Sequence, residues 1–218
     1  MNPGRLRTAV LISGTGSNLR TLIDAVSEGR LGLDIVQVIS NRATAPGLQH
    51  ARDAGIAHTL VESRDRARQD RALLAALDSC RAELVVLAGF MSILGPEPVN
   101  AYSGRMINLH PSLLPLYPGL DTYRRALAAG DAEHGASIHF VTTDLDAGPV
   151  IAQVRIPILE GDTPQSLAAR LGPREHQLLR ATVELFTQRR VELHGADVLL
   201  DGHRIPQPLQ LNDRDRFD

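Results

Sequence analysis

The sequence predicts a single α/β domain in which a mainly parallel sheet carries helices on both faces, followed by a C-terminal helix and a small hairpin. Two observations lead to this fold class. Short apolar runs alternate with longer segments of helical spacing through residues 1–160, which is typical of βαβ units. Several runs, such as AVLI at 9–12, are apolar at every position, as expected of strands that are buried on both faces.

The individual elements follow from these local patterns. Apolar runs bounded by glycine, proline or polar residues predict strands, and apolar residues recurring three or four positions apart predict helices. We expect strands at 7–13, 35–40, 58–61, 84–87, 106–110 and 136–142, and helices that begin near residue 18 and span 46–54 and 66–80.

The last third of the chain has a different pattern. We expect a strand at 150–157 and a long helix at 163–190, with a possible break at Gly172-Pro173. The pair Asp201-Gly202 suits a tight hairpin turn between two short strands. The charged segment from Asn212 is expected to be loosely held. We therefore assign one domain at 1–205 and a C-terminal tail at 206–218.

Composition excludes several classes of protein. All 23 basic residues are arginine, which excludes lysine Schiff-base chemistry, lysine-anchored pyridoxal chemistry and the lysine-dependent Walker-A loop. The net charge of -2 gives no case for a nucleic acid or a membrane surface as partner. No apolar run reaches the ~18 residues of a membrane-spanning helix. The first five residues do not resemble a secretory signal, and the single Cys80 fits a reducing, cytoplasmic setting.

A glycine-containing turn follows the first strand. The segment SGTGSN at 13–18 lies where a buried strand passes into a helix, and the free backbone amides of a helix start attract phosphate. Leu19 stands where the dinucleotide fingerprint has its third glycine. A monophosphate therefore fits better than a pyrophosphate, although a turn that serves the fold alone remains an alternative.

Two further polar segments follow later strands. In a parallel, Rossmann-like sheet, ligands gather at the carboxyl ends of the strands. Asn108 and His110 are two residues apart on one strand and so project to the same face. An amide beside an imidazole can stabilise an oxyanion. The loop TTDLDAGP at 142–149 carries Asp144 and Asp146, and a carboxylate in it is expected to raise the pKa of a nearby histidine and keep it protonated. Structural roles for these residues are the alternative at each position.

The remaining reactive side chains give weaker signals. His134 and His139 are five residues apart and face opposite sides of a strand, so they make a poor metal pair, and His139 is expected to be a core or supporting residue. No pattern typical of a metal site appears, and we predict none. The arginines at 64, 66, 68 and 71 are expected to form a solvated helix face.

Five segments, taken together and in this order, resemble the phosphoribosylglycinamide formyltransferase family, the folate-dependent enzymes of purine synthesis. They cover nearly the whole chain to about residue 205: LISGTGSNL at 11–19, ISNRATAPGL at 39–48, VVLAGFMSIL at 85–94, GRMINLHPSLLPLYPGL at 104–120 and EHGASIHFVTTDLDAGPVI at 133–151.

The resemblance implies transfer of a formyl group from 10-formyltetrahydrofolate to the amine of glycinamide ribonucleotide, without a metal or a covalent enzyme intermediate. It implies that Asn108, His110 and Asp146 are catalytic, and that Gly16, Ser17, Asn18 and Glu175 bind the ribonucleotide. The residues that it places on the folate are Arg66, Met91, Ser92, Ile93, Leu94, Asn108, Thr142, Thr143, Asp144, Leu145 and Asp146.

One departure from the family pattern occurs at Gly172. The family usually offers the ribonucleotide a polar side chain there, which glycine lacks, and we consider Arg174 as a possible substitute. The same resemblance leaves formyltetrahydrofolate hydrolysis and a non-catalytic nucleotide-binding module as alternatives. The expected partners are small-molecule substrates alone, with no nucleic acid and no membrane, and the chain is expected to be a monomer or a homodimer.

Overall fold

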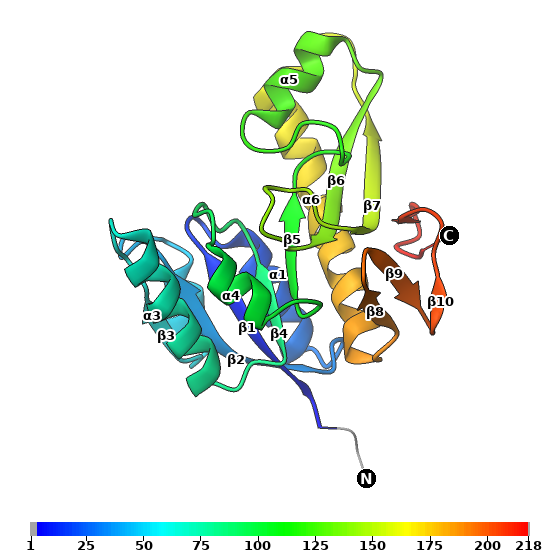
Figure 1. The fold of residues 1–218 in the computed structure, drawn as a ribbon. Helices are drawn as coiled ribbons and strands as arrows, with labels where there is room; N and C mark the ends of the chain where they lie inside the picture. The colour runs from blue at the N-terminus through cyan, green and yellow to red at the C-terminus, as the bar shows by residue number, and fades with distance from the viewer. Residues whose placement is uncertain (1–3, 218) are drawn as a thin grey trace.

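The computed structural model describes residues 4–217 and shows one central sheet flanked by helices (Figure 1). The sheet has eight strands in the order β11-β7-β6-β5-β4-β1-β2-β3. Their bounds are β1 (Leu6–Ile12), β2 (Leu33–Ser40), β3 (His58–Leu60), β4 (Leu84–Leu87), β5 (Met106–His110), β6 (Glu133–Phe140), β7 (Val150–Pro157) and β11 (Leu209–Gln210). Strands β1 to β5 are mutually parallel, whereas β6 runs antiparallel to both β5 and β7.

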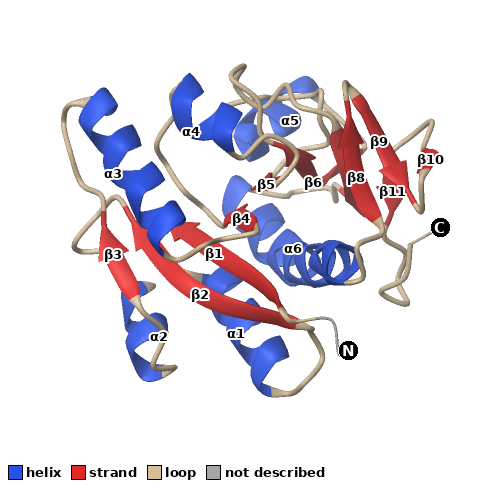
Figure 2. Cartoon of the chain, turned by 60° about the horizontal axis from the view of Figure 1, so that its bottom comes forward, coloured by secondary structure: helices blue, strands red, loops and turns tan. Residues whose placement is uncertain are grey.

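Helices cover both faces of this sheet (Figure 2). They are α1 (Ser17–Ser27), α2 (Leu48–Asp53), α3 (Arg66–Ser79), α4 (Pro96–Ala101), α5 (Thr122–Ala129) and α6 (Pro164–Thr187). Strand β1 shows why two layers form: Val10 and Ile12 pack into the core shared with α1, α2 and α6, whereas Ala9 and Leu11 pack into the core shared with α3 and α4. Alternate side chains of a strand point to opposite faces, so an all-apolar strand needs cover on both. The predicted fold class is confirmed.

The long C-terminal helix is continuous. Its N-cap Thr163 accepts a hydrogen bond from the backbone of Ser166, and Pro164 occupies the first turn. The considered break at Gly172-Pro173 is wrong, because α6 runs through both residues to Thr187. Its buried residues, including Leu167, Leu171 and Leu178, fasten it to the sheet, and tertiary packing of this kind overrides local propensity.

The segments after α6 are more ordered than the sequence suggested. The expected hairpin is present as β9 (Asp197–Leu200) and β10 (His203–Arg204), and β8 (Val191–His194) extends it to a second, three-stranded sheet. The segment from Asn212 does not lie loosely: the Arg174 guanidinium donates to the Asn212 carbonyl at 2.9 Å, and Phe217 forms an antiparallel bridge with Leu211. Before it, β11 pairs in parallel with β7. The last residue, 218, and residues 1–3 lie outside the part of the chain described.

Helices α4 and α5, strand β8 and strand β11 were not predicted. Each is short, between two and eight residues, so an apolar period has little room to show. Helix α4 also contains two prolines within the sequence PEPVNA, which reads locally as a loop.

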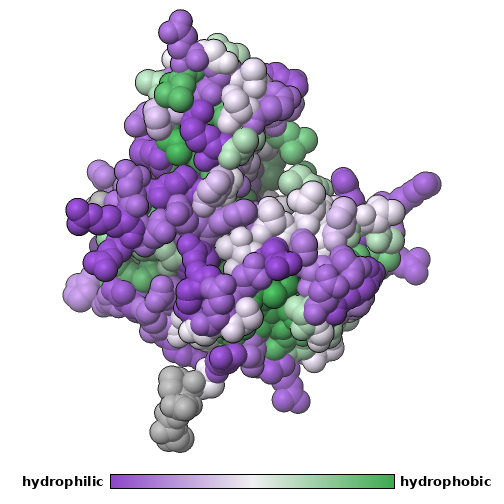
Figure 3. Space-filling view, turned by 180° about the vertical axis from the view of Figure 1, so that it is seen from behind, coloured by the Kyte–Doolittle hydropathy of each residue, from purple (hydrophilic) through white to green (hydrophobic). Residues whose placement is uncertain are grey.

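Figure 3 shows a face covered mainly by hydrophilic side chains, with small hydrophobic areas between them. Within residues 4–217, no helix is long and apolar enough to cross a membrane.

Candidate active site

The site is built on β5 and on the loop that follows β6. Asn108 and His110 lie on β5, and the antiparallel register places Asn108 opposite His139 and His110 opposite Ser137. Since β6 runs antiparallel, its carboxyl end lies beside the start of β5, where the Val141 N–H donates to the carbonyl of Met106 over 2.9 Å. The loop at 142–149 therefore does not start from the carboxyl edge of the parallel strands, where we expect all three polar segments to lie. It folds back over the face of β5 instead.

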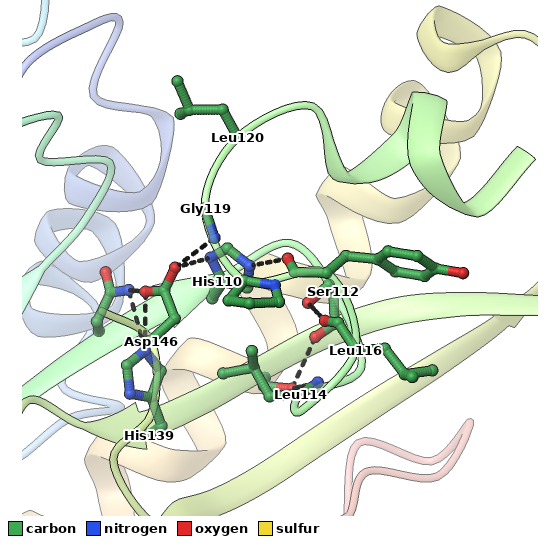
Figure 4. A network of polar contacts seen from close by, with 12 residues as sticks. His110, Ser112, Leu114, Leu116, Gly119, Leu120, His139 and Asp146 are labelled. Carbon is green, nitrogen blue, oxygen red and sulfur yellow. Dashed lines mark hydrogen bonds and ion pairs between the residues drawn. The ribbon is translucent and has the colours of Figure 1, made fainter. Parts of the chain in front are cut away.

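Asp146 is the centre of the polar network (Figure 4). Its Oδ2 accepts a hydrogen bond from the Gly119 N–H at 2.8 Å and lies 3.4 Å from Nδ1 of His110. Its Oδ1 lies 3.4 Å from the amide nitrogen of Asn108 and 3.6 Å from Nε2 of His139. The fold thus brings together the three residues predicted to be catalytic.

His139 joins this network, although the sequence suggested no more than a core or supporting role. Its Nδ1 lies 2.9 Å from the carbonyl oxygen of Phe140, to which it can only donate, so Nε2 can accept from the Asn108 amide at 3.1 Å. The ring thereby orients the amide beside Asp146. His139 reaches the site because β6 pairs with β5, so its role could have been predicted only from the antiparallel register of these two strands.

The backbone of the Asp146 loop is specialised. Asp146 has φ 50°, a left-handed conformation in which aspartate is enriched and which often marks functional sites. Two residues on, a Cβ at Gly148 would collide with the carbonyl oxygen of Phe140. The close return of the chain at Gly148, together with the Phe140 N–H to Pro149 O bond at 3.0 Å, turns the Asp146 side chain toward β5.

Burial acts on both titrating partners in the pair. It raises the pKa of Asp146, but the nearby His139 and His110 rings and the hydrogen bond from the Gly119 N–H outweigh it, so this pKa lies below its usual 3.8. Burial lowers the pKa of His110 below 6.5, and it outweighs the opposite effects of the Tyr117 carbonyl and the Asp146 carboxylate. The Asp146 carboxylate thus acts on the His110 pKa in the expected direction, but burial has the larger effect.

The predicted phosphate turn sits at the start of α1. Gly16 is its N-cap with φ 74°, and a Cβ there would lie 2.7 Å from Cα of Gly47. Only glycine allows the two backbones this approach. Ser17 is exposed, and the Oδ1 of Asn18 is buried without a hydrogen-bond partner among the described residues. The turn presents the free amides of a helix start, as an anion site would, whereas the unpartnered Oδ1 of Asn18 is an acceptor and needs a donor.

A second loop, at 88–95, follows β4 and is held from below. The Met91 N–H donates to Oγ of Ser13 at 2.7 Å, the Ser92 hydroxyl donates to Oε1 of Gln69 at 2.7 Å, and the Arg66 guanidinium donates to the carbonyl of Leu94 at 2.9 Å. Met91 and Ile93 remain 60% and 55% exposed, which is unusual for side chains of this size on a fastened loop.

The loop after β6 also exposes an apolar side chain. Leu145 is 53% exposed, and its Cδ2 would lie 3.8 Å from a Cβ at Gly119. The Thr142 hydroxyl donates to the carbonyl of Asp144 at 3.3 Å, whereas Thr143 and Asp144 are exposed. The two loops therefore offer exposed apolar side chains near the polar network around Asp146.

Glu175 lies apart from this network, on α6. The Tyr123 hydroxyl donates to its Oε1 at 3.2 Å, and burial raises its pKa to about 7. One turn before it, Gly172 has open space where a Cβ would stand. Arg174 does not fill that space, because its guanidinium is bound to the C-terminal tail. The considered compensation by Arg174 is therefore wrong.

The buried carboxyl of Glu175 predicts a pH-dependent stability. Its pKa is about 7 in the folded chain against the usual 4.5, so between these values the unfolded chain releases a proton that the folded chain keeps. The wild type therefore loses stability as pH rises through this window. Glu175→Gln, whose amide oxygen can still accept from Tyr123, is expected to be more stable than wild type by at most about 3 kcal/mol above pH 7.

Urea unfolding at pH 4, 6 and 8 checks this. The difference between Glu175→Gln and wild type should vanish at the lowest pH and grow as pH rises. A difference that is independent of pH would contradict the buried, uncharged state of the carboxyl.

Among residues 4–217, no three His, Cys, Asp or Glu side chains are placed to hold a metal ion together. The arrangement at Asp146 instead offers a carboxylate, an amide and two imidazoles within hydrogen-bonding or ion-pairing reach. Such a group can donate to an oxygen on which negative charge develops and can move a proton.

Comparison with known proteins is consistent with this geometry. Residues 6–183 match the formyl transferase family. The phosphoribosylglycinamide formyltransferase of Escherichia coli (strain K12) is 47% identical over 204 residues, which cover 92% of this chain and 96% of that protein. The Haemophilus influenzae protein of the same name is 40% identical over the same shares. The structure of the Coxiella burnetii phosphoribosylglycinamide formyltransferase superposes with a TM-score of 0.88 at 46% identity, over 92% of this chain and 95% of that one. The chain belongs to the formyl transferase family, among its phosphoribosylglycinamide formyltransferases.

Proposed function

We propose that this enzyme transfers the formyl group of 10-formyltetrahydrofolate to the amine of N1-(5-phospho-D-ribosyl)glycinamide. The products are formylglycinamide ribonucleotide and tetrahydrofolate, in de novo purine (IMP) biosynthesis. The observation that carries the proposal is that Asn108 and His110 both contact the carboxylate of Asp146, in a chain with the family membership described above.

The ribonucleotide is assigned to the α1 side of the site. Gly16, Ser17 and Asn18 hold its phosphate at the helix N-terminus, since free amides and the helix dipole favour an anion there. Glu175 binds the ribose end, where Gly172 leaves room beside it. The buried, unpartnered Oδ1 of Asn18 is an acceptor, so it supports a hydrogen-bond donor of the ligand at this turn, whereas the Asn18 amide nitrogen is the group that can donate to the phosphate.

The folate is assigned to the two apolar loops. A flat heteroaromatic ring needs apolar cover with a few hydrogen bonds, and the exposed Met91, Ile93 and Leu145 fit that need. The cosubstrate supplies the formyl carbon. The residues assigned to it are Arg66, Met91, Ser92, Ile93, Leu94 and Asn108 together with Thr142, Thr143, Asp144, Leu145 and Asp146.

In the reaction, Asn108 and His110 stabilise negative charge on the formyl oxygen when the amine attacks. The Asn108 amide can turn to this oxygen because its contact with Asp146, at 3.4 Å, is long for a hydrogen bond. A developing oxyanion raises the pKa of His110, so the step itself favours the imidazolium, which donates to the formyl oxygen. Asp146 pairs with the imidazolium and relays the proton that leaves the attacking amine to the folate nitrogen, whose bond to the formyl carbon breaks as the tetrahedral intermediate collapses.

The unliganded geometry implies one rearrangement. Nε2 of His110 lies 2.9 Å from the Tyr117 carbonyl, to which it donates. A formyl oxygen that takes its hydrogen bond from this nitrogen has to replace that carbonyl. The turn at 117–119 also holds Asp146 through Gly119, so movement of this turn would release both groups together.

Hydrolysis of the folate is the second candidate. A formyltetrahydrofolate deformylase from Burkholderia mallei superposes with a TM-score of 0.82 at 33% identity, over 90% of this chain but 70% of that one. Water would then replace the ribonucleotide amine as the nucleophile at the same three residues.

A turnover assay separates the two. With 10-formyltetrahydrofolate present, we expect tetrahydrofolate to appear only when the ribonucleotide is added, with formylated ribonucleotide as coproduct. Folate release without the ribonucleotide would establish the hydrolase. Folate binding without release under either condition would favour a non-catalytic module.

The proposal extends to the organisation of the protein. We assign the formyltransferase domain to residues 1–205 and the tail to 206–218, and we propose a cytoplasmic monomer or homodimer. Its partners are the two small-molecule substrates, with no nucleic acid, membrane or metal.

A further inference from the structure

Arg174 fastens the C-terminal tail to helix α6. Its guanidinium donates to the backbone carbonyls of Leu211 at 3.2 Å and Asn212 at 2.9 Å. It also lies 3.3 Å from an oxygen of Asp215 and 3.5 Å from one of Asp213. The side chain is 16% exposed. Two carbonyls and two carboxylates around one partly buried guanidinium are far more than a surface ion pair supplies.

The tail is itself fixed to the sheet, so it can serve as an anchor. The Leu211 N–H donates to the carbonyl of Gln153 on β7 at 2.8 Å, and Leu211 is buried. Leu211 also pairs with Phe217 in an antiparallel bridge, and Phe217 packs against the main core. Arg174 thus ties α6 to a folded segment rather than to a mobile end.

The point of attachment directly follows a turn of α6 that lacks one backbone hydrogen bond. Pro173 has no N–H, so the carbonyl of Ala169 lacks its helical donor. Gly172 adds backbone freedom in the same turn, because glycine is among the poorest helix formers after proline. Arg174 is the next residue, and Glu175, which contacts Tyr123 of α5, follows directly. The turn that carries Glu175 therefore directly follows one that the helix holds with one hydrogen bond fewer.

We propose that Arg174 is a positioning residue, and that its grip on the tail at 211–215 holds the Glu175 turn of α6 in place for the ribonucleotide. The tail acts on substrate affinity through this one side chain, without touching the substrate. The inference rests on the proposed role of Glu175 in ribonucleotide binding. It gives the C-terminal tail a function in the site that its sequence position does not suggest.

Steady-state kinetics on four variants test this. Arg174→Gln is expected to raise KM for the ribonucleotide about tenfold, which corresponds to the loss of a charged hydrogen-bond cluster. The KM for the folate and kcat should stay within about twofold, since neither the residues assigned to the folate nor the three catalytic residues belong to this turn. Arg174→Lys should restore part of the affinity, because it keeps the charge but not the planar fork. Arg180→Gln is the matched control: it lies on the same helix and reaches the tail only at 4.0 Å from Asp215.

Glu175→Gln is the fourth variant and distinguishes the positioning role of Arg174 from the binding role of Glu175. If it raises the ribonucleotide KM whereas Arg174→Gln leaves it unchanged, the positioning role of Arg174 is overturned and the proposed ribonucleotide site stands. If neither changes this KM, Glu175 does not bind the ribonucleotide and both assignments fail. Equal rises in the KM of both substrates for Arg174→Gln would indicate general destabilisation and would also overturn the positioning role of Arg174.

Hydrogen exchange gives a second readout that is independent of turnover. In the full-length protein, Arg174→Gln should speed exchange of the amides at 174–178, and Arg180→Gln should not. A double variant that combines Arg174→Gln with Asp215→Asn should exchange no faster than Arg174→Gln alone, since both changes break the same contact. Additive effects in this pair would contradict a single clamp.

Discussion

Asp146→Asn is expected to lower kcat by about 10³-fold or more while leaving the fold intact, because it removes the charge that pairs with His110 when an oxyanion forms. Asparagine can still accept from the Gly119 N–H and tolerates the left-handed backbone at this position. The change therefore isolates charge from shape. Single-turnover measurement at saturating substrates gives the chemical step directly, and thermal unfolding confirms that the variant is folded.

Asp121→Asn provides the matched control. Asp121 also has a left-handed backbone, with φ 58°, but its side chain is exposed and lies 4.0 Å from Arg124. Its kcat should equal that of the wild type. Near-wild-type turnover in Asp146→Asn would remove Asp146 from the mechanism, whereas an equal loss in Asp121→Asn would show that the assay reports loop conformation.

His110→Ala is the second change with a large expected effect, a loss of about 10²–10⁴ in kcat. The ring is buried and lies against the Tyr117 carbonyl and the Asp146 carboxylate, so its removal takes away both the donor to the formyl oxygen and the partner of the carboxylate. The KM of either substrate should change much less than kcat, because the loss concerns transition-state charge.

Removal of a buried ring can also destabilise the fold, and a second variant separates this effect. His110→Asn keeps a polar group able to donate one hydrogen bond but cannot become a cation. If catalysis needs the imidazolium, His110→Asn loses nearly as much kcat as His110→Ala. Recovery of most of the activity in His110→Asn would show that a neutral donor is enough.

Much of the fold could be predicted because its signals are local. The apolar strand at residues 9–12 requires cover on both faces wherever it lies, and the two cores around β1 supply it. The long helix α6 was predicted from its local start signal, the N-cap candidate Thr163 followed by Pro164. Its continuity through Gly172-Pro173 was not, because packing of distant apolar residues against the sheet outweighs a weak turn.

The candidate site divides in the same way. Asn108 and His110 share a strand, so their common face followed from the two-residue period. The approach of Asp146 depends on β6 being antiparallel and on the loop turning back at Gly148. His139 escaped prediction as a member of the site for the same reason: it lies opposite Asn108 across a strand pair, 31 positions away along the chain.

The sequence by itself determined the α/β class, the order of the main strands and helices, and the residue types able to stabilise an oxyanion. Local periodicity and motif spacing are enough for these. Only the tertiary structure decided that burial outweighs the Asp146 charge at His110, that Arg174 faces the tail rather than Gly172, and that the tail is folded. Each of these depends on which distant groups share a volume, and that is a property of packing that no local pattern contains.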